Sequence, residues 1–338
     1  MIKSIYPLTE SVLEKVDLNA AIKVIKSKKI TMGQKTKEIE KYFKNNVVRT
    51  DSLMVNSGSS ANLLIFQCLI NPLVKKLKLG DEVLIPAICW STSLWPIIQS
   101  GLKVKFVDID TSSLNIDLKD LEKKITKKTK ALMLVHALGN CAEMDKLTRI
   151  CKKNKLILVE DACEALGSRF KNKQLGTFGE FSSFSFYYSH HITSGEGGMV
   201  CVKNKKYLNV IKSLRSHGWS KGLSNSKSIS KKYKNIDKNW IFVNSGFNLR
   251  PTDINAAIGI QQLKRLKKIL KIRKYNFLKI KKKLINNKKY NNQFSILSDQ
   301  KYSSIAWFGI PFMLNSKNKI YKHKVMNKLK QKGIMTRP

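Results

Sequence analysis

Short apolar runs alternate with charged, amphipathic stretches through the middle of the chain, and this alternation predicts both strands and helices. The amphipathic stretches Leu118–Lys127 and Met144–Asn154 are typical of helices that cover a sheet. Apolar strands separated by helices predict a mostly parallel sheet covered on both faces, which binds ligands at the carboxyl ends of its strands. The runs interpreted as strands are Ser52–Val55, Glu82–Ile85, Val104–Val107, Ala131–Val135 and Leu156–Val159.

The pattern on either side of this region predicts further helices and two more strands. Residues 9 to 45 look helical, with a break at Thr31–Gln34, and a long basic helix is predicted over Thr252–Leu284. Two strands, Ser182–Tyr188 and one that begins near Met199, flank a glycine cluster. The remaining predicted elements are a helix over Ala61–Ile70, a helix from Lys203 to about Leu214, a polar loop over Ser220–Lys238, a strand over Ile305–Leu314 and a helix over Tyr321–Lys332.

These elements predict two domains. A chain of 338 residues can bury a large core, and one large domain plus a smaller one is the natural expectation. We assign 1–250 to the large domain, with its N-terminal helical segment, and 251–338 to the long helix and a partial α+β domain. The pattern stops in mid-domain at Pro338, so we expect a fragment or a truncated chain.

The chain is strongly basic, with a formal net charge of +41. Such a charge suggests nucleic acid, an anionic membrane or an acidic substrate as partner. Only eight of the 64 basic residues are Arg, and the Lys residues are spread along the chain, without zinc-finger spacing or an RNA-recognition aromatic signature. We interpret the charge as solvated surface and expect neither nucleic acid nor a membrane as partner. A nucleic-acid-binding protein remains an alternative that rests on the charge alone.

The cysteine pattern and the N-terminus favour a cytoplasmic protein. No Cys-x-x-Cys pair is present, and most cysteines lie in apolar segments, which indicates reduced, buried thiols. The segment Met1–Pro7 lacks the apolar core of a signal peptide. The most apolar run, Val83–Ile98, is interrupted by Pro86 and Pro96 and is too short to span a bilayer. The six cysteines are Cys68, Cys89, Cys141, Cys151, Cys163 and Cys201.

The segment Phe184–Gly198 contains two adjacent histidines, His190 and His191, between a predicted strand and a glycine cluster. Strand ends and loops hold groups that face a ligand, although two histidines in an ordinary turn would look the same. The segment resembles the active-site segment of the DegT/DnrJ/EryC1/StrS family of sugar aminotransferases, which are pyridoxal phosphate enzymes. The resemblance implies the fold of aspartate aminotransferase (fold type I): an α/β protein with a mostly parallel central sheet between helices and a smaller C-terminal domain.

Counting back from Gly195–Gly198, His190 stands where the family has the Lys that binds the cofactor covalently. In having a histidine at this position, the chain resembles the sugar 3-dehydratases of the family. The resemblance implies that pyridoxal or pyridoxamine phosphate is held non-covalently and that His190 is catalytic, with a near-neutral pKa suited to proton transfer. A related branch with an iron–sulfur cluster is disfavoured because no Cys follows Cys201. We expect no metal, and we expect a structural role for His191.

Two segments that follow predicted strands supply candidate cofactor ligands. In Asn56–Asn62, a Gly-Ser turn at a helix start suits a phosphate, although Ser there is also a common N-cap. The resemblance assigns Gly58 and Ser59 to the cofactor phosphate. It also assigns Asp161 to the ring nitrogen, where a carboxylate keeps the cofactor protonated, and Glu164 to a place near the pyridine ring. Acids that cap a helix after a strand are the ordinary alternative.

Three further segments match family positions. Trp90 is suited to lie flat on the cofactor ring, although most Trp residues belong to the core. The resemblance makes Ser185 a phosphate ligand and Asn248 a ligand that reaches the phosphate from the neighbouring subunit, which implies a homodimer with shared active sites. His217 and Arg250 are placed near the substrate.

The resemblance covers about residues 25–338 and implies a specific reaction. Its expected substrate is a nucleotide-linked 4-keto-6-deoxyhexose such as GDP-4-keto-6-deoxy-D-mannose, with CDP as the competing nucleotide, and the reaction removes the C3 hydroxyl for dideoxysugar and lipopolysaccharide O-antigen biosynthesis. L-Glutamate would regenerate the pyridoxamine form. The alternatives are a nucleotide-sugar aminotransferase that uses another Lys and a non-catalytic B6-binding paralogue.

Overall fold

The structure is a computed structural model of the chain. It describes residues 5–10, 12–288, 290, 294–314 and 322–337. No helix within these ranges is long and apolar enough to cross a membrane.

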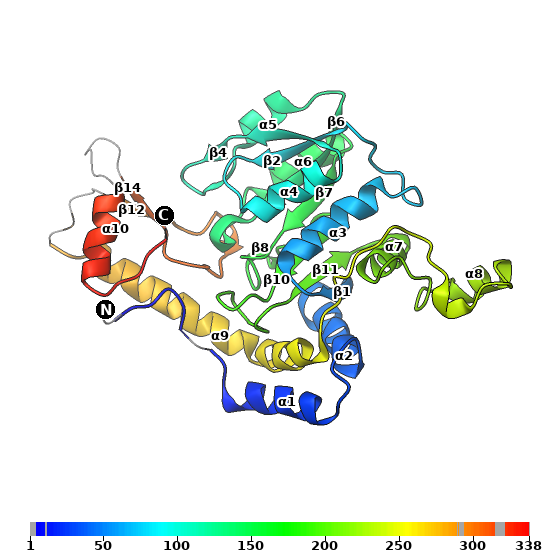
Figure 1. The fold of residues 1–338 in the computed structure, drawn as a ribbon. Coiled ribbons are helices and arrows are strands. Elements are labelled where there is room, and N and C mark those ends of the chain that lie inside the picture. Colours follow the sequence, from blue (N-terminus) through cyan, green and yellow to red (C-terminus); the bar gives the residue numbers. More distant parts are fainter. Residues whose placement is uncertain (1–4, 11, 289, 291–293, 315–321, 338) are drawn as a thin grey trace.

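A seven-stranded sheet forms the centre of the molecule, in the order β1-β11-β10-β7-β6-β2-β3 (Figure 1). The strands β10, β7, β6, β2 and β3 run parallel, whereas β11 pairs antiparallel with both β1 and β10. The prediction of a mostly parallel sheet is therefore confirmed. The strands are β1 (Asp51–Val55), β2 (Glu82–Pro86), β3 (Lys103–Val107), β6 (Thr129–Val135), β7 (Ile157–Asp161), β10 (Phe181–Ser185) and β11 (Gly198–Val202).

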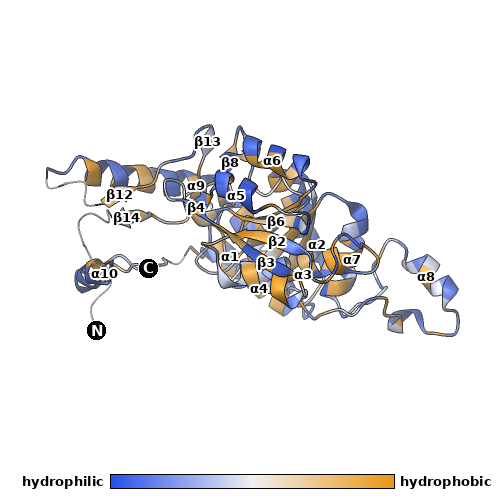
Figure 2. Ribbon diagram, turned by 90° about the horizontal axis from the view of Figure 1, so that it is seen from above, coloured by the Kyte–Doolittle hydropathy of each residue, from blue (hydrophilic) through white to orange (hydrophobic). Residues whose placement is uncertain are grey.

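Helices cover both faces of this sheet and bury its apolar side chains in two cores. One core lies under α3 (Gly58–Ile70), α4 (Ser91–Gln99) and α7 (Lys205–Arg215). The other lies under α2 (Gln34–Phe43), α5 (Leu118–Lys124), α6 (Met144–Lys153) and α9 (Asp253–Ile285). Figure 2 shows apolar strands at the centre and hydrophilic positions on the outer helices, as expected for a sheet covered on both faces. The inner strands β2, β6 and β7 contain continuous apolar runs because both of their faces are buried, whereas the edge strand β3 is partly exposed.

The N-terminal helices α1 (Lys15–Lys26) and α2 (Gln34–Phe43) pack on the long helix α9 (Asp253–Ile285). The carboxylate of Asp253 accepts the N–H groups of Gly33, Lys35 and Thr36, at 2.9–3.0 Å, and so caps the start of α2. An acid at a helix N-terminus also stabilises the helix dipole. A carboxylate at the start of one helix therefore fixes the start of another that precedes it by more than 200 residues.

The C-terminal part contains β12 (Phe294–Ile296) paired with β14 (Phe312–Leu314), followed by α10 (Lys322–Gln331). The N-terminal segment runs beside it, with Tyr6 in a bridge to Ile334. The prediction of one strand over Ile305–Leu314 is wrong, because only its last three residues are a strand. The predicted helix over Tyr321–Lys332 is confirmed from Lys322 onward; Tyr321 lies outside the described residues.

Other predicted boundaries also differ from the structure. Strand β10 ends at Ser185 instead of Tyr188, because the chain turns there and the N–H of His190 bonds the carbonyl of Tyr187 at 3.0 Å. The polar loop over 220–238 contains a short helix that projects from the body of the molecule (Figure 1). The remaining elements are α8 (Ser226–Lys232), β4 (Ile109–Asp110), β5 (Asn115–Ile116), β8 (Arg169–Phe170), β9 (Lys173–Gln174), β13 (Ser303–Ser304), η1 (Lys44–Val48), η2 (Ala137–Gly139) and η3 (Lys238–Trp240).

Candidate active site

Asp161 ends β7 at the carboxyl edge of the parallel strands, and its side chain is held by three donors. Its Oδ2 accepts hydrogen bonds from Asn62 Nδ2 at 2.9 Å and Ser93 Oγ at 2.7 Å, and its Oδ1 accepts one from the N–H of Cys163 at 3.1 Å. These donors come from α3, α4 and the chain after β7, so three separate elements fix one buried carboxylate. A carboxylate held in this way has a defined direction in which it can bind a cationic N–H.

The start of α3 lies beside Asp161 and offers free backbone donors. Ser57 caps the helix: its Oγ accepts from the N–H of Ser60 at 3.1 Å, and its carbonyl accepts from that of Ala61. Among the described residues, the N–H groups of Gly58 and Ser59 have no such partner. Free N–H groups at the positive end of a helix dipole form a ready anion site. The helix start therefore contains an N-cap at Ser57 and also free N–H groups at Gly58 and Ser59 that suit an anion.

Gly58 brings α3 close to the end of β10. A Cβ at Gly58 would lie 2.7 Å from Ser185 Cβ and 2.9 Å from Cys163 Sγ, so only glycine permits this approach. Ser59 Oγ donates to Thr92 Oγ1 at 2.8 Å, which joins this helix start to α4. The structure thus brings Gly58, Ser59 and Ser185 to one place, next to the carboxylate of Asp161.

His190 lies in the turn after β10, between two aromatic rings. Its ring centroid is 5.9 Å from that of Tyr187 and 5.1 Å from that of Phe308, both edge-on. Its Nδ1 is shielded from solvent and has no hydrogen-bond partner in the described part of the chain. The expectation of a near-neutral pKa is wrong: burial, opposed by the charge of Asp161 and assisted by the cations Arg273 and Arg337, lowers the pKa of His190 to about 4.

His191 differs from its neighbour in being completely buried and hydrogen-bonded. Its Nε2 donates to the carbonyl oxygen of Ala306 at 2.7 Å, and burial lowers the pKa of its side chain to about 3. This neutral, fixed ring joins the turn after β10 to the C-terminal part of the chain. The geometry supports the expected structural role of His191.

Glu164 lies just after Asp161 and binds the turn that follows the neighbouring strand β6. Its Oε2 accepts from the N–H of Leu138 at 2.7 Å. The pKa of Glu164 is raised to about 6, chiefly by burial and also by the negative charge of Asp161. The hydrogen bond from Leu138 and the cation Arg337 act in the opposite direction. This carboxyl therefore exchanges its proton near neutral pH.

Asn248, Arg250 and His217 gather in a second group around Trp219, at the edge of the sheet. Arg250 Nε donates to Asn248 Oδ1 at 2.9 Å, and its guanidinium lies 6.0 Å from the Trp219 ring centroid. The His217 ring meets the same indole edge-on at 5.3 Å. Among the described residues of one subunit, no hydrogen bond, ion pair or ring contact joins this group to Asp161 or His190.

Trp90 immediately precedes α4, close to the residues that hold Asp161. Its side chain is 68% exposed, which is unusual for the largest apolar side chain. The indole is therefore not part of the core, and the alternative that the sequence left open for it is excluded.

The sequence prediction missed Arg273, Arg337 and Phe308. The two guanidinium groups act on His190 by charge, and Phe308 by ring contact. One signal could have found the arginines: Arg supplies only eight of 64 basic residues, so each Arg marks a place where the guanidinium geometry matters. No sequence signal separates Phe308 from an ordinary core residue.

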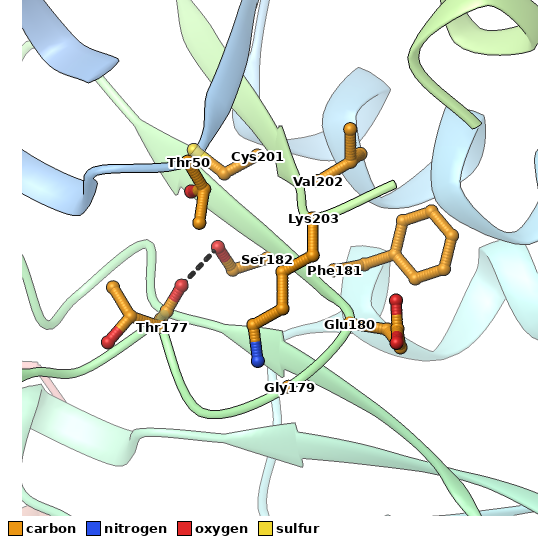
Figure 3. Close-up of a pocket in the computed structure, with 10 residues that line it drawn as sticks. Thr50, Thr177, Gly179, Glu180, Phe181, Ser182, Cys201, Val202 and Lys203 are labelled. Atoms are coloured by element: carbon orange, nitrogen blue, oxygen red, sulfur yellow. Dashed lines mark hydrogen bonds between the residues drawn. The ribbon is translucent and has the colours of Figure 1, made fainter. Parts of the chain in front are cut away.

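A shallow pocket lies at the opposite end of β10, beside Phe181 and Lys203 (Figure 3). There Ser182 Oγ donates to the carbonyl of Gly176 at 2.6 Å. Because β10 runs from Phe181 to Ser185, this pocket and the residues around Asp161 are at different edges of the sheet. Within the described ranges no group of three or more His, Cys, Asp or Glu is placed to hold a metal ion, and all six cysteines are free.

The arrangement fits pyridoxal phosphate. The helix start at Gly58 and Ser59 suits a phosphate, and the oriented carboxylate of Asp161 suits a protonated ring nitrogen. A family model described as the DegT/DnrJ/EryC1/StrS aminotransferase family matches residues 12–338. The chain belongs to this family.

Several of the similar proteins are named as GDP-4-keto-6-deoxy-D-mannose 3-dehydratases. The GDP-4-keto-6-deoxy-D-mannose 3-dehydratase of Yersinia pseudotuberculosis is 38% identical over 335 residues, 98% of this chain and 84% of the relative. A structure of the Escherichia coli GDP-4-keto-6-deoxy-D-mannose-3-dehydratase with bound hydrated PLP has a TM-score of 0.92 at 34% identity, covering 99% of this chain and 85% of that one. Another GDP-4-keto-6-deoxymannose-3-dehydratase structure holds a trapped PLP-glutamate geminal diamine, with a TM-score of 0.91, 34% identity and coverage of 98% and 85%. The fold prediction is confirmed.

Proposed function

We propose that this chain catalyses the C3 dehydration of a nucleotide-linked 4-keto-6-deoxyhexose, GDP-4-keto-6-deoxy-D-mannose, with non-covalent pyridoxal or pyridoxamine phosphate and with L-glutamate as the amine donor. The observation that carries this proposal is His190 at the place of the family's lysine, because an imidazole cannot form the covalent link that a transaminase keeps with its cofactor. The similar proteins named as GDP-4-keto-6-deoxy-D-mannose 3-dehydratases support the same reaction.

The cofactor, when bound, supplies the amine that condenses with the C4 keto group and a conjugated ring that accepts electrons. Asp161 keeps the ring nitrogen protonated, because its carboxylate is fixed by Asn62, Ser93 and Cys163. Gly58 and Ser59 bind the phosphate through their N–H groups, and Ser185 adds its hydroxyl. Trp90 covers one face of the ring.

His190 moves the proton. Because its pKa lies well below neutral, its imidazole is uncharged at pH 7 and can accept a proton from the carbon that bears the cofactor's amine. The resulting imidazolium is a strong acid for the same reason, and it returns the proton to the departing C3 hydroxyl. The lowered pKa therefore keeps the imidazole free to accept a proton and strengthens the imidazolium as an acid, whereas it makes the neutral ring a weaker base. Glu164 lies close to the ring, and because its pKa is raised to about 6, its carboxyl can gain or lose a proton slightly below neutral pH.

The proposed enzyme is a cytoplasmic homodimer with shared active sites. Asn248 would reach the phosphate of the partner subunit, with His217 and Arg250 near the substrate. Among the described residues of one subunit, no hydrogen bond or ring contact joins their group to Asp161. Large exposed aromatic side chains are consistent with a covered surface, among them Trp95, Trp240 and Phe242. The proposed domain division is 1–250 and 251–338.

A coupled assay tests the reaction. The purified protein would receive pyridoxal phosphate, glutamate and GDP-4-keto-6-deoxymannose, and 2-oxoglutarate, ammonia and the mass of the sugar would be followed. We expect the sugar to lose one oxygen and to release one ammonia for each 2-oxoglutarate. An amino sugar without ammonia would identify an aminotransferase and would overturn the role of His190. The CDP-linked substrate, run in parallel, decides the nucleotide.

A further inference from the structure

A four-residue segment, Ile305–Phe308, lies against the turn that contains His190 and His191, and hydrogen bonds hold its backbone groups. We call it the strap. The N–H of Ala306 donates to Ser168 Oγ at 2.9 Å, and the N–H of Phe308 donates to the carbonyl of Leu138 at 2.9 Å. Arg273 Nη2 donates to the carbonyl oxygens of Trp307 and Phe308, at 3.2 and 2.6 Å. Anchors on the sheet side and on α9 leave the strap little freedom.

The strap places the Phe308 ring against His190. The two ring centroids are 5.1 Å apart with an interplanar angle of 64°, and Tyr187 meets the imidazole from another side at 5.9 Å and 87°. The adjacent His191 is locked to the same strap through the carbonyl of Ala306. The catalytic turn and the strap are therefore one packed unit, although they are more than 100 residues apart in sequence.

A general base is usually oriented by a hydrogen bond from its second ring nitrogen to a carboxylate or a carbonyl. His190 has no such partner: its Nδ1 is shielded from solvent and unpaired throughout the described residues. A ring without a hydrogen-bonded anchor can rotate about its χ angles unless packing prevents it. Edge-on aromatic contacts are directional and can supply that restraint.

We propose that Phe308 is a positioning residue that orients the imidazole of His190 by ring packing in place of the usual hydrogen bond, with Tyr187 on the other side. This role rests on the proposed function only in naming His190 as the proton carrier; the packing itself is a property of this chain. Held in this way, the imidazole keeps both nitrogens free of protein partners, as a group that accepts and then returns a proton requires.

The same packing helps to keep the imidazole uncharged, because burial is the largest cause of the lowered pKa of His190. Removing the Phe308 ring would admit water to one side of the imidazole and raise the pKa toward its ordinary value. The groups with charges or titrating side chains around His190 are Asp161 on β7, Arg273 on α9, Arg337 near the C-terminus, and His191 and Tyr187 in its own turn.

NMR of the histidine side chains tests the inference without any turnover. In protein loaded with pyridoxal phosphate and labelled at its five histidines, the His190 signal would be assigned from its loss in His190→Asn and titrated with pH. We expect a pKa that rises clearly in Phe308→Ala and stays near the wild-type value in Phe308→Tyr, which keeps the ring. An unchanged titration in Phe308→Ala would overturn the inference.

Phe277→Leu is the matched control, because Phe277 stacks on Trp307 of the same strap at 5.0 Å but does not meet His190. It should lower the Tm without moving the His190 titration. If it moves that titration as much as Phe308→Ala does, the strap acts only through general stability and the inference fails.

Turnover adds an independent readout. In the coupled assay, Phe308→Ala should lower kcat about 10- to 100-fold, with little change in KM for glutamate, since a misplaced group costs up to about that factor. Phe308→Tyr should retain activity. If the wild type does not turn over the sugar, the proposed function fails, whereas the titration still decides the role of Phe308.

Discussion

The imidazole of His136 and the carboxylate of Glu160 lie 2.9 Å apart, Nε2 to Oε2, and both side chains are completely inaccessible to solvent. Glu160 also accepts the N–H groups of Gly176, Phe178 and Gly179 at 2.6–2.8 Å. One carboxylate therefore joins the end of β6, the end of β7 and the turn before β10. Because Asp161 follows Glu160 directly, the hydrogen bonds of Glu160 also fix the backbone next to the residue that is proposed to bind the cofactor's ring nitrogen.

Glu160→Gln should destabilise the protein by about 2–4 kcal/mol, because an amide group would face N–H donors and leave buried groups unpaired. The free energy of unfolding of Glu160→Gln, measured with denaturant at pH 7, checks this. The exposed Glu122→Gln serves as control and should change stability by less than about 0.5 kcal/mol.

The same carboxylate makes stability depend on pH. Burial by itself raises the pKa of Glu160, but the hydrogen bond and charge of His136 and the N–H groups of Gly179 and Gly176 outweigh it, so the pKa is lowered. A lowered carboxyl pKa contributes stability above the unfolded value of about 4.3, and this is lost as the pH falls through the folded value. The wild type should therefore lose more Tm on acidification below about pH 4.3 than Glu160→Gln does. Parallel loss in both proteins would contradict the assignment.

His190→Lys should turn the cofactor from a dissociable ligand into a covalently attached one. A lysine amine forms a covalent link with the cofactor's aldehyde, which borohydride reduces and which can be read from the protein mass and the absorbance. We expect dehydration to be lost at the same time. Persistent dehydration in this variant would refute the role of His190, and His190→Asn, which cannot form the link, is the control for the mass shift.

Gly58→Ala should weaken binding of pyridoxal phosphate at least about tenfold, because its Cβ would displace Ser185 or Cys163 and with them the phosphate donors. A fluorescence titration of cofactor binding measures this. Gly309→Ala is the matched control: a Cβ there meets nothing within 4 Å, so its affinity should equal that of the wild type. Equal affinities in both variants would remove Gly58 from the phosphate site.

Glu164→Gln should change the pH dependence of turnover. With a pKa raised to about 6, Glu164 is mostly protonated below that pH and mostly ionised above it. The wild-type kcat profile should therefore contain a limb near pH 6, and the variant, which cannot ionise there, should lack it. A limb that persists in Glu164→Gln would have to come from another group.

A mixing experiment tests the shared active site. Asp161→Asn and Asn248→Ala should each be strongly impaired as homodimers, because each lacks one proposed cofactor ligand. Mixed after partial unfolding, they should regain up to about a quarter of wild-type activity, since half of the dimers would be mixed and each would contain one intact site. If the mixture stays as inactive as its parts, Asn248 acts within its own subunit.

Local sequence patterns determined most of the fold and part of the candidate site. The apolar runs around Leu84, Leu132 and Leu158 predict parallel strands, because strands buried on both faces need apolar side chains throughout. The order of motifs from Gly58 to Asn248 identified the family without coordinates. Residues such as Gly58 and Asp161 carry their signals locally, in a helix start and a strand end.

Only the tertiary structure decided how distant residues act on one another. The apolar sequence of the strap predicts a strand, but its backbone groups bond to three unrelated segments instead of a neighbouring strand. The pKa of His190 likewise depends on burial by Phe308 and on the charges of Arg273 and Arg337. Residue identity sets the ordinary pKa of a histidine, but its desolvation and neighbouring charges arise only when segments that are distant in the sequence pack together.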